Sequence, residues 1–406
     1  MKIRQFTVLF TCNLIPLFIG MGLFPVLPIY AAQFGATRTD VGIFYAAVYV
    51  ASALSMLWTG WLVARLPRRA LFVAAGGVGV PALALLGQAS TLWQVVALTG
   101  MVWFCGGVTL AITSVYAGES AAGIRRGRLF SLLFLAYPLA ALTGGAAVGQ
   151  LTARYGYTAM FAALAAFWLI QPVVGLLGLQ PRAPQRQEQQ SAFAGAIPPG
   201  GTFAALLISA LLASAAVNIA RLGSALSMRA LGFPPEAAAS TVTVSGLATI
   251  PLALLIGSLS DRIGRRRALA LSYALTAAGA GTLLAATQLW QFQLAATLVL
   301  AAWCANRAVA SAFTADVLPS QALGRAIPRL NATDSLASIA GFAATGYVMD
   351  ALGPSYLYAA GVALALAAAT ALSRIGRHTL PPLSGQPVPA LVPVPSRPDD
   401  SARAER

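Results

Sequence analysis

The sequence predicts an all-α membrane protein with twelve transmembrane helices in two repeated bundles of six. Three observations support this prediction. Hydrophobic residues make up 58% of the 406 residues and charged residues only 9%, whereas a soluble protein carries about 25% charged residues. The apolar residues form about a dozen runs near the roughly 20 residues that cross a bilayer. Landmark residues also recur at a constant spacing along the chain.

The apolar runs and the breaks between them place the helices. The first half predicts helices at 6–31, 41–63, 70–89, 93–117, 127–152 and 156–178, and the second half at 202–229, 236–260, 267–287, 290–315, 324–349 and 354–373. The first run is too long for a signal-peptide core and predicts a spanning helix. We therefore expect an N-terminal bundle at 1–178, a cytoplasmic linker at 179–201, a C-terminal bundle at 202–373 and a disordered cytoplasmic tail at 374–406.

The basic residues gather on one side of the predicted bundles. With the N-terminus inside, 21 of the 26 basic residues fall in cytoplasmic segments, and three (Arg38, Arg154 and Arg229) fall on the other side. The positive-inside rule therefore predicts that both termini are cytoplasmic. Heavy use of Ala, Gly and Arg indicates a GC-rich bacterial gene and hence the bacterial cytoplasmic (inner) membrane. The basic clusters form no continuous face, so the net charge of +15 does not indicate nucleic acid binding.

An internal repeat relates the two halves. A shift of 197 residues superimposes glycines, a Trp-Gln pair, an acidic residue and a Gly-Arg pair. The matches are Gly35 with Gly232, Gly60 with Gly257, Trp93-Gln94 with Trp290-Gln291, Glu119 with Asp316, Gly127-Arg128 with Gly324-Arg325, Gly144 with Gly341, Gly149 with Gly346, and Gly156 with Gly353. Six helices per half is an even number, so the halves share one orientation and form a parallel repeat.

A motif between the predicted eighth and ninth helices carries a family resemblance. The segment Gly257-Ser-Leu-Ser-Asp261-Arg262-Ile-Gly264-Arg265-Arg266 resembles the major facilitator superfamily signature G-x-x-x-D-R-x-G-R-R. Between the second and third helices, the matching segment is Gly60-Trp-Leu-Val-Ala64-Arg65-Leu-Pro67-Arg68-Arg69, in which Ala64 replaces the aspartate. The resemblance covers residues 1 to about 375 and implies the major facilitator fold of two pseudo-symmetric six-helix bundles.

The same resemblance implies a cytoplasmic gate that holds the outward-facing state closed on the inside. Since Ala64 removes one carboxylate, we expect the gate to be asymmetric, with Asp261 as its principal acidic group. The expected members are Gly60, Arg65, Arg68, Gly257, Asp261, Arg262, Gly264, Arg265, Arg266, Glu119, Asp316 and Arg325.

The first helix resembles one branch of this family. The stretch Gly22-Leu-Phe-Pro25-Val-Leu-Pro28-Ile-Tyr30 is similar to the G-x-x-P-x-x-P-x-Y pattern of the drug-efflux-like branch. This resemblance implies efflux of a lipophilic or drug-like compound by an antiporter, with protons as a candidate coupling ion. The predicted helix 93–117 departs from the branch because it lacks the arginine that the branch often uses in proton coupling.

Three charged residues fall inside predicted helices, where charges usually face a cavity or a partner. Arg307 lies eight residues before the end of helix 290–315 and Asp334 ten residues into helix 324–349, so the two lie at similar depth. They predict either a titratable pair with Asp334 as the proton acceptor or a static buried ion pair. Arg221 is expected either to meet an anionic substrate or to extend toward the outer interface.

Other polar and aromatic residues are candidates for a substrate or coupling site: Asn218, Asn306, Asn13, Tyr30 and Tyr137. Each taken alone is more often a helix-packing group or an interfacial anchor. The leading prediction is a secondary active transporter that moves a small organic solute by alternating access, with its site near the midplane. The alternatives are an organic-anion transporter using Arg221 and Arg307, or a non-transporting sensor.

The sequence does not predict an enzyme, because it contains no Walker, HExxH or GxSxG motif. We expect no cofactor and no metal. The expected partners are the lipid bilayer, a small-molecule substrate and, as a coupling ion, protons. We expect a monomer.

Overall fold

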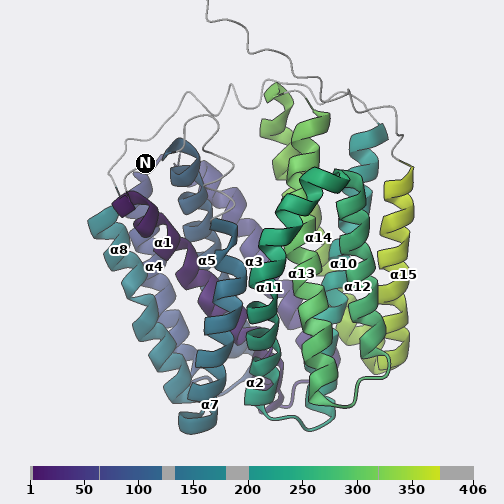
Figure 1. The fold of residues 1–406 in the computed structure, drawn as a ribbon. Helices are drawn as coiled ribbons and strands as arrows, with labels where there is room; N and C mark the ends of the chain where they lie inside the picture. The colour runs from purple at the N-terminus through teal and green to yellow at the C-terminus, as the bar shows by residue number, and fades with distance from the viewer. Residues whose placement is uncertain (1–2, 64, 121–132, 180–200, 319, 375–406) are drawn as a thin grey trace, which may run out of the picture.

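The computed structural model describes residues 3–63, 65–120, 133–179, 201–318 and 320–374, which contain helices and connections but no strands. The first half comprises α1 (Ile3–Leu23), α2 (Leu27–Ala32), α3 (Arg38–Val63), α4 (Arg68–Leu86), α5 (Leu92–Ser120), α7 (Ala136–Trp168) and α8 (Ile170–Gly178). The second comprises α10 (Gly201–Ala230), α11 (Pro235–Ile263), α12 (Arg265–Leu283), α13 (Leu289–Val317), α14 (Ser320–Ala351) and α15 (Pro354–Ser373). The helices of the two halves form bundles that stand side by side (Figure 1).

The prediction of twelve transmembrane helices is confirmed. α1 and α2 together form the first helix. α7 and α8 form the fifth and sixth, because Gly156 interrupts α7 with a φ of 76° and a ψ of 179°. By length and composition alone, eight described stretches are apolar enough to span a membrane, with Ala136–Gly178 counted once. α11, α12 and α14, which are richer in charged or hydroxyl side chains, complete the twelve.

Glycines in the left-handed region mark the repeat in three dimensions. Gly35 and Gly232 have φ values of 75° and 77°, and Gly156 and Gly353 have values of 76° and 93°. The members of each pair are 197 residues apart and occupy matching turns. Because residues with a Cβ rarely adopt this conformation, each pair requires glycine in both halves.

The first transmembrane helix is broken, so the prediction of one continuous helix at 6–31 was wrong. α1 ends at Leu23, and a turn precedes α2. Pro25 has no amide hydrogen to continue the helical ladder, whereas Pro28 is tolerated because it lies in the first turn of α2. The break places Phe24 between the two halves.

The halves meet closely on the side that carries the turns at Gly35 and Gly232, which we call the distal face. There α3 packs against α14, and α7 against α11. A Cβ built on Gly42 of α3 would lie 2.9 Å from the Cα of Gly346 in α14. Larger side chains would therefore separate these backbones.

Polar contacts complete the distal seal. Asp350 in the last turn of α14 accepts hydrogen bonds from the backbone N and the Oγ1 of Thr39, at 2.8 and 2.7 Å. It therefore caps the first turn of α3 from the opposite half. Arg229 of α10 donates to the carbonyl oxygen of Ala36 at 2.8 Å, which adds a second link between the halves.

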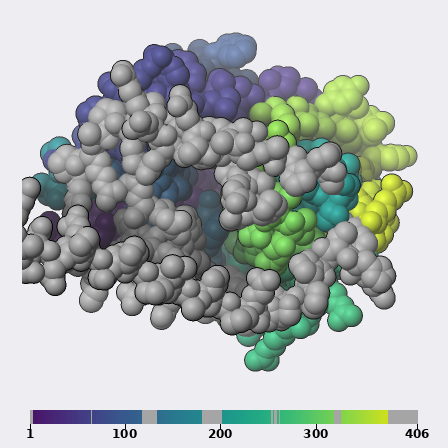
Figure 2. Space-filling view, turned by 90° about the horizontal axis from the view of Figure 1, so that it is seen from above, coloured from purple at the N-terminus to yellow at the C-terminus, as the bar shows by residue number. Residues whose placement is uncertain are grey.

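The opposite side, where α1 begins and α15 ends, is the proximal face. Seen from this side, the described helices of the first half and of the second half flank a hollow between them (Figure 2). The molecule is thus closed at its distal face and hollowed at its proximal face.

Candidate functional site

A cavity lies between the halves, and each helix around it contributes one face. Its lining residues on α1 are at positions 13, 16, 17, 19, 20 and 21, with Phe24 directly after the helix, and those on α14 include positions 331, 334, 335 and 338. Spacings of three and four residues place side chains on one side of a helix with 3.6 residues per turn. The two helices therefore each present a continuous stripe to the cavity.

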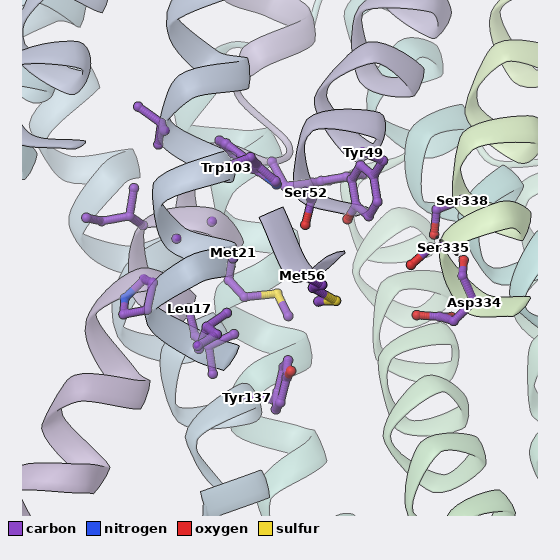
Figure 3. A pocket seen from close by; sticks show the side chains of 18 of the residues that line it. Leu17, Met21, Tyr49, Ser52, Met56, Trp103, Tyr137, Asp334, Ser335 and Ser338 are labelled. Carbon is purple, nitrogen blue, oxygen red and sulfur yellow. Dashed lines mark hydrogen bonds between the residues drawn. The ribbon is translucent and has the colours of Figure 1, made fainter. Parts of the chain in front are cut away.

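The deeper part of the cavity, which we call the inner compartment, has a volume of about 180 Å³. Its first-half wall is mainly apolar and aromatic, whereas its second-half wall is polar and charged. Figure 3 shows Met21, Met56 and Tyr137 facing Asp334 and Ser338 across the space. The second-half wall consists of Arg221, Trp303, Arg307, Asp334, Ser335 and Ser338.

The outer compartment, with a volume of about 450 Å³, is more polar. It shares Tyr137, Arg307 and Asp334 with the inner compartment, so the two are continuous. Its remaining polar lining comes from both halves: Asn13, Thr113 and Ser114 from the first, and Ser214, Asn306, Ser311, Asn331 and Thr333 from the second.

Arg307 and Asp334, predicted to lie at similar depth, are brought together at the junction of the compartments. Nη1 of Arg307 in α13 donates to Oδ2 of Asp334 in α14 at 2.7 Å. The two side chains keep 26% and 24% of their exposure, so the pair borders the cavity rather than lying wholly inside the protein. The positive charge of Arg307 is therefore balanced by a carboxylate.

Arg221 occupies the distal end of the inner compartment. Its guanidinium carbon lies 4.1 Å from the centre of the Phe24 ring and 5.6 Å from that of Trp303. Among the residues that the structure describes, no carboxylate forms an ion pair with Arg221. Its charge is stabilised by two aromatic faces, one from each half, and is available to a ligand.

The two asparagines Asn13 and Asn306 line the outer compartment. Nδ2 of Asn13 donates to the carbonyl oxygen of Leu133 at 3.1 Å, which ties α1 to the chain just before α7. Asn306 is 6% exposed, and its Oδ1 has no hydrogen-bond partner in the described part of the chain. Both asparagines therefore keep an oxygen that can accept a hydrogen bond.

Two predicted site residues, Asn218 and Tyr30, lie outside both compartments. Asn218 is buried, and its Nδ2 donates to the carbonyl oxygen of Ser214 and to Oγ of Ser338, so it joins α10 to α14 behind the cavity wall. Tyr30 is also buried, and its hydroxyl donates to the carbonyl oxygen of Leu86 at 2.7 Å inside the first half. Neither residue lines either compartment.

The predicted gate motif of the second half lies at the proximal face. Gly264, with a φ of 89°, separates α11 from α12, whereas the matching Pro67 has a φ of −59°. Arg265 then bridges two helices, because it donates to Oγ of Ser260 at 2.6 Å and to Oδ2 of Asp316 at 3.2 Å.

The structure shows fewer contacts for the other predicted gate residues. Arg266 donates to the carbonyl oxygen of Ser373 at 2.7 Å, and Arg65 stacks on Trp61, with 3.8 Å between its guanidinium carbon and the ring centre. Gly60 and Arg262 are exposed and Arg68 is buried. The side-chain positions of Glu119, Gly257, Asp261 and Arg325 lie outside the described residues.

Two aromatic residues of the cavity escaped the sequence prediction. Phe24 and Trp303 hold Arg221, and Trp303 also lies 5.4 Å from the guanidinium carbon of Arg307. Trp303 lies one helical turn before Arg307, which is a detectable signal. Phe24 had no such signal because it lies at the break in the first transmembrane helix.

Comparisons with known proteins agree with this architecture. The family model described as Major Facilitator Superfamily matches residues 9–218 and again residues 201–398. No curated protein matches the sequence.

Two solved structures share the fold at 13% sequence identity. A variant of the nucleoside transporter NupG has a TM-score of 0.75, with 91% of this chain and 99% of that chain covered. A bacterial homologue of the human lysosomal transporter Spinster, in an inward-facing and unoccupied conformation, has a TM-score of 0.65, with 92% and 95% covered.

Proposed function

Because the chain belongs to the major facilitator superfamily, a family of transporters, we propose that it moves a small amphipathic organic anion across the membrane by secondary, alternating-access transport. The cavity between the halves would hold the substrate. The aromatic or apolar part would contact the first-half wall, and the anionic group would meet Arg221.

Arg221 carries this proposal. A guanidinium inside a membrane protein is costly unless it meets a partner or a functional ligand. The described structure gives Arg221 aromatic faces but no carboxylate, while the nearby Arg307 is already neutralised by Asp334. A carboxylate or sulfonate would supply the missing charge through short, charge-assisted hydrogen bonds.

A second candidate is efflux of an uncharged lipophilic or drug-like compound, as the resemblance to the drug-efflux-like branch implies. The observation that favours it is the first-half wall, where Leu17, Met21, Met56 and Trp103 offer an apolar, adaptable surface. The two candidate functions can be distinguished by experiment, because only transport of an anion requires the charge of Arg221.

The proposed orientation places the proximal face in the cytoplasm of a bacterial cell, with the protein a monomer in the inner membrane. The distribution of basic residues supports this orientation, because, among the described residues, the distal loops and helix ends carry only Arg38, Arg154 and Arg229. In that orientation, the closed distal face and the hollow proximal face describe an inward-facing conformation.

The test is the binding of three naphthalene compounds of similar size to the purified full chain: naphthoate, naphthalenemethanol and naphthylmethylammonium. We expect naphthoate to bind at least about tenfold more tightly than the other two, because one charge-assisted hydrogen bond contributes about 1.5–3 kcal/mol. The Arg221→Gln variant should lose this preference, and Arg154→Gln, which changes an exposed distal arginine, should keep it.

Equal binding of naphthoate and naphthalenemethanol to the wild-type chain, unchanged in Arg221→Gln, would exclude the anion and favour the lipophilic compound. Titration calorimetry gives the three dissociation constants directly.

A further inference from the structure

Several hydroxyl groups that line the outer compartment already donate their hydrogen atoms to the protein backbone. Each of four lining hydroxyls donates to a carbonyl oxygen three or four residues earlier in its own helix, at 2.7 to 2.9 Å. They are Thr113, Ser114, Ser311 and Thr333.

A hydroxyl that has donated its only hydrogen can still accept, because its oxygen carries two lone pairs. The asparagines have the same character. Asn13 uses its amide hydrogen on Leu133 and keeps its oxygen, and the oxygen of the buried Asn306 has no partner in the described structure. The outer compartment therefore presents these oxygens from both halves as hydrogen-bond acceptors, beside Tyr137, Ser214 and Asn331, which can donate or accept. This lining favours a ligand that carries several hydrogen-bond donors.

The charge of the outer compartment indicates what kind of donor fits. Its charged lining residues are Arg307 and Asp334, which pair with each other, so the described lining has no net charge. Arg221 adds an uncompensated positive charge in the adjoining inner compartment. An ammonium ligand would meet this repulsion without a free carboxylate, whereas neutral hydroxyl groups donate hydrogen bonds with no such cost.

We propose that the outer compartment is a binding subsite for a neutral, hydroxyl-rich group such as a glycosyl unit. The aromatic and anionic part of the same molecule would lie in the inner compartment. The substrate class is then an aromatic glycoside with an acidic group. Placement of its aromatic part rests on the proposed anion transport, but the glycosyl subsite does not depend on Arg221.

The dimensions agree with a single molecule that occupies both compartments. They share Tyr137, Arg307 and Asp334, and the outer volume of about 450 Å³ lies within the range of about 300–1,000 Å³ that is usual for small-ligand sites. The acceptors come from both halves, so a bound glycosyl unit would contact both.

The experiment compares the binding of para-glucosyloxybenzoate, its tetra-O-methyl ether and para-methoxybenzoate to the purified full chain. The methyl ether keeps every oxygen of the sugar but has no hydroxyl donor. We expect the glucoside to bind at least about tenfold more tightly than para-methoxybenzoate, and the methyl ether to lose that gain, since each net hydrogen bond contributes about 0.5–1.5 kcal/mol.

Variants separate hydrogen bonding from the added bulk of the methyl groups. The double variant Ser114→Ala and Thr333→Val removes two accessible acceptor oxygens, one from each half, with little change of shape. It should weaken the glucoside about tenfold and leave para-methoxybenzoate unchanged. Thr143→Val is the matched control, because Thr143 makes the same bond to its own helix but is exposed outside the cavity.

Unchanged glucoside binding in the double variant would overturn the proposal. The outer compartment would then be a water-filled entrance and not a binding subsite. The same comparison with phenyl glucoside, which has no carboxylate, tests the subsite without the anion. Weaker binding of phenyl glucoside to the double variant supports the subsite, even if the Arg221→Gln variant shows that Arg221 does not recognise an anion.

Discussion

At the scale of single residues, the two arginines of the cavity differ in their partners. Arg307 is 2.7 Å from Asp334, whereas Arg221 contacts the rings of Phe24 and Trp303. Removal of the carboxylate of Asp334 would leave the charge of Arg307 unbalanced, and Arg307 would become a second cation available to an anionic substrate.

The variant Asp334→Asn tests this charge balance. Naphthalenesulfonate should bind the variant about tenfold more tightly than the wild-type chain, because Arg307 is no longer paired with a carboxylate and can meet the anion. Titration calorimetry measures the dissociation constants, with Asp40→Asn, a distal carboxylate outside both compartments, as the control.

Unchanged affinity in Asp334→Asn would contradict the idea that Asp334 keeps Arg307 from binding the anion. A size-exclusion profile like that of the wild-type chain confirms that the variant is folded.

The candidate site was only partly predictable from the sequence, for a geometric reason. Helix depth can be counted along the chain, and it placed Arg307 and Asp334 at one level. Which way a side chain points depends on helix rotation, which local sequence fixes weakly when most of the helix is apolar. For this reason Asn218 and Tyr30 resembled cavity residues but form structural hydrogen bonds behind the wall.

At the scale of elements, the seam between α3 and α14 closes part of the distal face. Asp350 holds the first turn of α3 with two hydrogen bonds across the halves. Next to this cap, Gly42 and Gly346 let the backbones of the two helices come into contact. The seal therefore combines a polar cap with close packing of small residues.

The variant Asp350→Ala should weaken the seal, because loss of a helix cap costs about 0.5–2 kcal/mol. Ser338→Cys, in the inner compartment, would report the effect through an impermeant maleimide added on the distal side of intact cells. We expect labelling to accelerate about 2- to 30-fold, the factor that this free energy gives.

Asp40→Ala is the matched control for this measurement. Asp40 is also a capping carboxylate on the distal face, but it bonds to Thr37 within its own half. Equal acceleration in both variants would mean that the α3–α14 seam has no special role in the closure.

The elements themselves were largely predictable, since the boundaries of most helices follow apolar runs that end in glycine, proline or charged residues. The exception is the first transmembrane helix, because the sequence shows its prolines but does not show whether each one kinks or ends the helix. A proline inside a membrane helix either kinks it, as packing allows, or breaks it. Pro16 lies within α1 without ending it, whereas the helix breaks at Pro25.

At the scale of the whole molecule, the repeat supplies a second seam like the first. A shift of 197 residues carries Gly42 to Ala239 and Gly149 to Gly346. Ala239 and Gly149 face each other between α11 and α7, where a Cβ built on Gly149 would lie 3.1 Å from the Cβ of Ala239. The halves therefore meet at two matched seams on one face, an arrangement that suits rigid-body rocking of one half against the other.

Repetition was the most informative property of the sequence at this scale. It predicted the pairing of the halves, which the two matches to one family model and the paired left-handed glycines support. It could not predict which face is closed, because both states of an alternating-access protein use the same helices.

A reversible lock on the distal seam tests the central claim most directly. In the double variant Thr39→Cys and Asp350→Cys, the two side chains that now share a hydrogen bond would be joined by a disulfide. The measurement is counterflow of labelled naphthalenesulfonate in proteoliposomes. The account predicts that oxidation stops counterflow and that a reductant restores it, while each single variant continues to exchange under the same oxidant. Undiminished exchange by the cross-linked protein would contradict alternating access through this cavity.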